Sequence, residues 1–162
     1  MNNSPEITKS RTVPILSISP IGDDHCALQD ILRHLDGTKD PNRAFTLKVC
    51  TTLVAARAAF STHAFDAVVC ENDLSPGSWR EVLEETVILP DPPPLIVTSR
   101  LADDRLWAEA LNLGAFDVLA KPFERTEATR VLEAALRAWE RTRRHPAHRE
   151  RSAVKVAAAH AS

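Results

Sequence analysis

Short apolar segments alternate with longer segments of helical periodicity along most of the chain. Each apolar segment has the length of a buried strand, and each is followed by apolar residues spaced three and four apart, as on one face of a helix. This alternation is typical of βα units that build a parallel sheet with helices on both faces. Five units can be counted, with strands expected at 15–19, 45–49, 66–70, 94–98 and 116–120.

Polar residues that favour helix ends divide these units. We expect Asp23 and Asp24 to cap the first helix, because aspartate there accepts hydrogen bonds and matches the helix dipole. Thr51 or Thr52 and then Ser78 are the expected caps of the next two helices, and Gly114 is expected to close the fourth. The helices should span 23–36, a segment through 53–60, 79–89, 104–113 and 127–141.

The length of 162 residues suits one domain, and the hydrophobic fraction of 44% is sufficient for its core. We expect a disordered segment at 1–12, a folded domain at 13–142 and a disordered basic tail at 143–162. No apolar run reaches the roughly 18 residues of a membrane span, and the N-terminus does not resemble a signal peptide. Three cysteines without CxxC spacing indicate reduced thiols, so the expected location is the cytoplasm.

Charge and glycine content make several binding functions improbable. The net charge of −2 gives no general reason to bind nucleic acid or a membrane, and only four glycines are present, with no phosphate-binding loop. The stretch 137–155 is basic, however, and it keeps a nucleic-acid-binding module as a weaker alternative. No helix-turn-helix pattern follows it.

In an open parallel sheet the functional crevice lies at the carboxyl ends of the strands. The residues to consider there are Ser19, Glu71, Thr98 and Lys121.

Two segments resemble the response-regulator receiver domain (CheY-like). They are TSRLADDRLWAEALNLGAFDVLAKPF at 98–123 and FDAVVCENDLSPG at 65–77, and the similarity spans roughly 13–140. The resemblance implies a flavodoxin-like (βα)5 α/β fold with strand order 2-1-3-4-5. It also implies a role in two-component (phosphorelay) signal transduction, in which an aspartate accepts phosphate beside an acidic pair that holds Mg²⁺, a hydroxyl and a lysine.

The match to this set is incomplete. It places Glu71 at the phosphoacceptor position, Thr98 at the hydroxyl and Lys121 at the lysine. The acidic-pair position falls on Ser19 and Pro20, neither of which is a carboxylate. An alternative register uses Asp23 and Asp24 as the pair, although it would place Pro20 and Gly22 inside a central strand.

These departures indicate an atypical receiver that binds a protein partner, such as a histidine kinase or a downstream effector, without phosphorylation and without being an enzyme. A permanent Glu71 charge beside Lys121 would imitate the phosphorylated state, or the two would form only a structural ion pair. The aromatic switch position of the family holds Val118. No cofactor is expected, and Mg²⁺ enters only in the alternative of a conventional phosphoacceptor receiver using Asp23 or Asp24.

The aromatic and sulfur residues leave further expectations. Trp107 and Trp139 lie in the fourth and fifth helices, where they fit either the core or a homodimer through helix four, strand five and helix five. Trp79 lies in the third helix. His25 does not complete a metal cluster, and the cysteines are expected to be small core residues: Cys26, Cys50 and Cys70.

Overall fold

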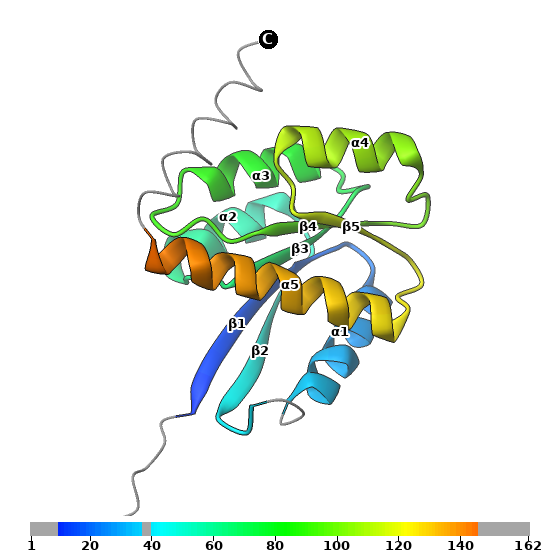
Figure 1. Ribbon diagram of the computed structural model, residues 1–162. Helices are drawn as coiled ribbons and strands as arrows, with labels where there is room; N and C mark the ends of the chain where they lie inside the picture. The colour runs from blue at the N-terminus through cyan, green and yellow to red at the C-terminus, as the bar shows by residue number, and fades with distance from the viewer. Residues whose placement is uncertain (1–9, 37–39, 146–162) are drawn as a thin grey trace, which may run out of the picture.

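The protein forms one parallel sheet covered by helices on both faces. A computed structural model describes residues 10–36 and 40–145. The five strands lie in the order β2-β1-β3-β4-β5, and every neighbouring pair is parallel (Figure 1). The predicted fold class and strand order are therefore confirmed. In chain order the elements are β1 Arg11–Ile18, α1 Gly22–Leu35, β2 Arg43–Cys50, α2 Leu53–Thr62, β3 Ala67–Glu71, α3 Trp79–Val87, β4 Leu95–Ser99, α4 Asp104–Leu113, β5 Asp117–Ala120 and α5 Arg125–Arg144.

Two hydrophobic clusters hold the helices to the sheet, one on each face. Alternate side chains of β1 divide between them, because successive residues of a strand point to opposite faces. Val13 and Ile15 join the cluster that buries α1 and α5, whereas Leu16 and Ile18 join the one that buries α2, α3 and α4. Strands buried on both faces explain why the sequence shows continuous apolar runs rather than polar alternation.

The first two strands are longer than their apolar segments indicate. β1 and β2 pair over eight residues, from Arg11 opposite Arg43 to Ile18 opposite Cys50. Arg11 and Thr12, which we expected in a disordered segment, thus belong to β1, because backbone pairing continues beyond the buried side chains. Arg143 and Arg144 likewise extend α5 into the expected tail. The rest of the expected terminal segments, 1–9 and 146–162, lies outside the described residues.

Helix starts differ from the sequence expectation at three places. Thr52 caps α2 as expected, since its hydroxyl accepts from the Ala55 N–H at 3.1 Å. Asp23 and Asp24 do not cap α1. The helix begins at Gly22, so Ile21 is at the cap position and both aspartates lie inside the first turn. Ser78 occupies the cap position of α3 but makes no capping hydrogen bond.

The last helix begins at Arg125 rather than Glu127, because Glu124 caps it. The Glu124 carboxylate accepts from the backbone N–H groups of Thr126 and Glu127, and these two bonds lower its pKa. Gly114, with φ 110°, ends α4 in the left-handed conformation that glycine adopts without strain.

Across residues 10–36 and 40–145, the helices are all too short or too polar to span a bilayer.

Candidate functional site

The carboxyl ends of β1, β3, β4 and β5 converge on a cluster of buried polar residues. Glu71 ends β3 and lies opposite Thr98 of β4 in the sheet register. Ser19 directly follows β1, and Lys121 directly follows β5. All four side chains are buried. The topology thus brings together residues that are up to about a hundred positions apart in the chain.

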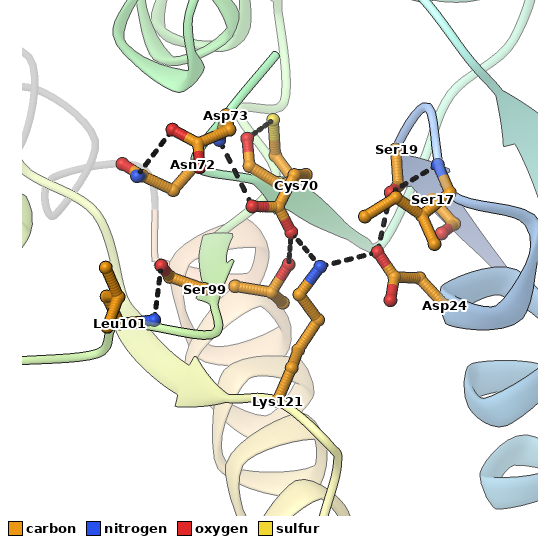
Figure 2. A network of polar contacts seen from close by, with 12 residues as sticks. Ser17, Ser19, Asp24, Cys70, Asn72, Asp73, Ser99, Leu101 and Lys121 are labelled. Carbon is orange, nitrogen blue, oxygen red and sulfur yellow. Dashed lines mark hydrogen bonds and ion pairs between the residues drawn. The ribbon is translucent and has the colours of Figure 1, made fainter.

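The ammonium of Lys121 lies between two carboxylates. Its Nζ is 2.7 Å from Oδ2 of Asp24, and it also forms an ion pair with Oε2 of Glu71. Figure 2 shows the Lys121 side chain reaching from the end of β5 toward Asp24, with its amine at the centre of the network. The side chains of Lys121 and Glu71 are each 4% exposed, so this contact is screened little by solvent.

Both carboxylate oxygens of Glu71 are occupied. Oε2 accepts from the Thr98 hydroxyl at 3.3 Å as well as from Lys121, and Oε1 accepts from the backbone N–H of Asp73 at 3.1 Å. These contacts hold the Glu71 carboxylate in one defined geometry.

The second carboxylate comes from α1 rather than from a strand end. The Ser19 hydroxyl donates to Oδ2 of Asp24 at 2.6 Å, and the Ser19 Oγ accepts from the Ile21 N–H at 3.1 Å. The short connection after β1 places the first turn of α1 directly over the site. Pro20 is exposed in this connection, outside the strand. Ser19 directly follows β1, where the first register places it, and Asp24, one of the two aspartates of the alternative register, contacts Lys121 from the first turn of α1.

A buried histidine supports the same connection. His25 Nε2 is 2.9 Å from the carbonyl oxygen of Ser19, and its Nδ1 is 2.7 Å from the hydroxyl of Ser17. A carbonyl oxygen only accepts, so Nε2 donates, and a neutral ring then accepts the Ser17 proton at Nδ1. We did not expect this role from sequence. A histidine in the first turn of a helix gives little local signal for this role.

The donor set does not fit Mg²⁺. The described residues contain no group of three or more His, Cys, Asp or Glu side chains able to hold a metal ion. Mg²⁺ requires near-octahedral oxygen ligands at about 2.0–2.1 Å. Here the ammonium of Lys121 occupies the space between the two carboxylates that approach each other, so a divalent cation would have to displace a buried ion pair.

A cavity of about 420 Å³ adjoins the cluster. Asp23, Asp24 and Lys121 are among the side chains around it. The other lining residues are Ala27, Arg100, Pro122 and Phe123. Asp23 therefore borders the site region.

Val118 and two of the tryptophans lie in the core. Val118 is buried beside the residues of α4 that contact the sheet, at the position where the family resemblance places an aromatic side chain. Trp79 is fully buried and Trp139 is buried, whereas Trp107 is 42% exposed.

One of the cysteine expectations is wrong. Cys50 and Cys70 are buried, and burial raises the pKa of each thiol. Cys26 is exposed, because the buried face of α1 runs through His25 and Leu28 and leaves Cys26 outside it. The Cys70 thiol donates to the backbone carbonyl oxygen of Glu71 at 3.4 Å.

Comparisons with known proteins agree on the architecture. No family model and no curated protein matches the sequence. Among solved structures, the receiver domain of a sensor histidine kinase from Pseudomonas aeruginosa, which holds a magnesium ion in its active-site cleft, matches with a TM-score of 0.63 at 20% identity, over 78% of this chain and 98% of that one. The signal receiver domain of an HD-domain-containing protein from Pseudomonas fluorescens matches with a TM-score of 0.67 at 22% identity, over 80% and 98%.

A chemotaxis response regulator, CheY4 of Vibrio cholerae, is similar over 78% of this chain and all of its own length, with a TM-score of 0.62 and 13% identity. These three proteins share the five-stranded parallel topology and little sequence with this chain. The chain has the fold of the receiver domains of response regulators.

Proposed function

We propose that this chain is a cytoplasmic signalling module of a two-component pathway, which binds a protein partner such as a histidine kinase or a downstream effector without being phosphorylated itself. One observation carries the proposal: the ammonium of Lys121 is already bound between the carboxylates of Glu71 and Asp24. The chain acts in this proposal as a binding module and not as an enzyme.

The contacts at Glu71 are the reason to expect independence from phosphate. Transfer of a phosphoryl group requires charged and hydroxyl groups that are free to contact it as it moves in line. Here Thr98 and Lys121 both contact Glu71. A glutamate also carries its oxygens about one C–C bond further from the backbone than an aspartate does. The permanent carboxylate thus supplies from within the chain the charge that a phosphoryl group would bring.

The buried Val118 supports a module with one dominant conformation. A ligand shifts a two-state equilibrium only if it binds the states differently. No side chain in the described part of β5 offers the aromatic ring that the receiver resemblance associates with such a shift. Signalling would then depend on whether the partner is bound.

Labelling with a small phosphodonor tests the proposal. We expect the wild-type chain to remain unlabelled when incubated with radiolabelled acetyl phosphate and Mg²⁺. Glu71→Asp tests whether the longer side chain blocks the chemistry, and Glu71→Gln is the control without a nucleophile. Ready labelling of the wild-type chain, lost in Glu71→Gln, would show that Glu71 is a working phosphoacceptor and would refute the proposal.

A conventional Mg²⁺-dependent phosphoacceptor is the second candidate, because Asp23 and Asp24 border the cavity beside Lys121. It predicts that Mg²⁺ or beryllofluoride changes the tryptophan fluorescence, and that Asp24→Asn removes the change. The matched control is Asp30→Asn, an exposed aspartate of the same helix. Under our own proposal, we expect neither Mg²⁺ nor beryllofluoride to change the fluorescence of the wild-type chain or of either variant. A response that only Asp24→Asn removes would favour the second candidate.

We also propose a homodimer through α4, β5 and α5. Three exposed apolar side chains support it, one in the connection before α4 and two along α4: Leu101, Trp107 and Leu111. Large apolar side chains that gather on one exposed face indicate an interaction surface. Light scattering at tens of micromolar chain should give a dimer mass. A monomer at that concentration would contradict this proposal, and Trp107→Glu should convert a dimer to monomer.

A further inference from the structure

The C-terminal half of α5 forms an arginine-rich hollow far from the Lys121 cluster. One cavity, of about 440 Å³, is lined by Phe116, Ala134, Arg137, Glu140, Arg141 and Arg144. A second, of about 300 Å³, is lined by Arg11, Trp139, Glu140, Arg143 and Arg144. Because the two share Glu140 and Arg144, they adjoin. We call them together the α5 hollow. In Figure 1 this is the orange end of α5, opposite the end that follows β5.

The carboxylates in and around the α5 hollow are already paired. Glu140 accepts from Arg11 at 2.6 Å, and Glu133 lies 3.7 Å from Arg137. Their charges are therefore not available to balance the remaining arginines.

Two of the remaining arginines, Arg141 and Arg144, carry unbalanced positive charge. Arg143 differs from them, because it lies over the ring of Trp139 at 4.6 Å and its charge also lowers the pKa of the Asp66 carboxyl. Arg141 and Arg144 are exposed, and within residues 10–36 and 40–145 neither has a carboxylate partner. Cations are also common in the last turn of a helix, where they interact favourably with the helix dipole. That interaction does not by itself explain why these arginines line a cavity beside an aromatic ring.

The residues that line the α5 hollow indicate which kind of anion it binds. Guanidinium groups bind carboxylates in a bidentate geometry. Phe116 and Ala134 add an apolar wall, so the hollow suits a segment that carries both acidic and apolar side chains. A long polyanion such as nucleic acid fits less well, because a net charge of −2 gives the whole chain no general electrostatic attraction for it.

We propose that the α5 hollow binds an acidic segment of a partner protein, with its carboxylates on Arg141 and Arg144 and an apolar side chain against Phe116. The surface is separate from the Lys121 cluster. The proposal therefore holds whether or not the chain is phosphorylated.

Fluorescence anisotropy with two labelled peptides tests this directly on the full chain. In the first peptide Glu and Asp residues flank a single Leu, and in the second Gln and Asn replace the acidic residues. We expect the acidic peptide to bind at least about tenfold more tightly than the amide peptide. We also expect Arg141→Glu/Arg144→Glu to weaken the acidic peptide at least about tenfold. Equal affinity for the two peptides would refute the proposal.

A matched control separates this local effect from a change in overall charge. Arg105→Glu/Arg125→Glu reverses the same number of charges at exposed positions in the first turns of α4 and α5. It should leave the affinity within about twofold of wild type. Thermal unfolding should show that both double variants are folded, and Arg141→Gln/Arg144→Gln serves if the charge reversal prevents folding.

Two further measurements can overturn the assignment. Peptide binding could be lost in Arg149→Gln/Arg151→Gln and remain intact in Arg141→Glu/Arg144→Glu. That result would refute the proposal, because it would assign the binding site to residues that follow α5 in the chain. Tighter binding of single-stranded DNA than of the acidic peptide, with a steep dependence on salt, would identify a nucleic-acid surface instead.

Discussion

Two ends of the same sheet each hold one cation between two carboxylates, in very different surroundings. At the carboxyl end Lys121 joins Glu71 and Asp24, and Lys121 and Glu71 are each 4% exposed. At the amino end Arg11 joins Asp66 and Glu140, and the Arg11 side chain is 45% exposed. Burial differs, whereas charge and stoichiometry are the same.

The difference shows what burial does to an ion pair. An exposed ion pair contributes little to stability, because water and salt screen the attraction between its two charges. In a buried cluster each charge depends on its partners, because an uncompensated charge in the interior costs several kcal/mol. The Lys121 cluster is thus poorly tolerant of substitution, and this sensitivity is measurable even if the cluster adds little net stability.

Removal of Lys121 should have the largest effect. Lys121→Met leaves the carboxylates of Glu71 and Asp24 facing each other, and we expect the free energy of unfolding to fall by about 3–5 kcal/mol. Urea denaturation at neutral pH measures it. Lys121→Met/Glu71→Gln removes one of the two charges and should recover part of the loss. If Lys121→Met were as stable as wild type, solvent would have to reach the two carboxylates, and the cluster would not be a buried ion pair.

The corresponding change at the amino end should cost less. Arg11→Met leaves Asp66 without its arginine, and Asp66 is 8% exposed at the side chain. We expect a loss of about 1–3 kcal/mol, the cost of one buried polar group left unsatisfied. The same urea titration compares it with Lys121→Met. A loss equal to that of Lys121→Met would mean that exposure of the cation does not reduce its importance here.

The pKa of Asp66 makes the amino end dependent on pH. Burial raises this pKa, and the neighbouring Arg11 offsets only part of the increase. The contribution of Asp66 to stability is therefore complete below about 3.9, the pKa of an unfolded aspartate, and is lost as pH rises toward the folded value.

Asp66→Asn should remove that dependence. We expect the stability of the variant relative to wild type to increase as pH rises from about 3.9 through the folded pKa, by urea denaturation over this range. Glu140→Asp keeps the charge near Arg11 and is the control. A relative stability that falls with pH would show that Arg11, and not burial, dominates the Asp66 pKa.

Loss of the more exposed partner of Arg11 should have the smallest effect. Glu140→Gln removes one exposed pair, and we expect a change of no more than about 1 kcal/mol, further reduced by salt. Thermal unfolding at low and high ionic strength measures it. A larger, salt-independent loss would place Glu140 in a buried network with Asp66.

The sequence predicted the fold well because the fold depends on repeated, local signals. The strands contain short apolar segments and each helix has an apolar face, so the order of the elements follows from the pattern. The proximity of Glu71, Thr98 and Lys121 follows in turn, since strand ends of a parallel sheet lie at one edge.

The remaining features depend on geometry that leaves no periodic signal. Asp24 reaches the site because the connection after β1 is short and turns α1 over the strand ends, whereas its position in the chain favoured a helix cap. The extension of β1 to Arg11 depends on backbone pairing with β2. The exposure of Cys26, by contrast, was open to prediction, because the apolar positions from Leu28 to Leu35 put residue 25 rather than residue 26 on the buried face of α1.

The contact between Lys121 and Asp24 joins residues 97 positions apart, and the contact between Arg11 and Glu140 joins residues 129 apart. Closing a loop of that length has an entropic cost that must be met before the contact forms. The Lys121 cluster therefore assembles only after β5 has joined the sheet, and the contact between Arg11 and Glu140 forms only after α5 has docked. During refolding, the recovery of both contacts should trail the pairing of β1 with β3, and in a chain still being synthesised the contact of Arg11 with Glu140 would form last, once α5 had emerged.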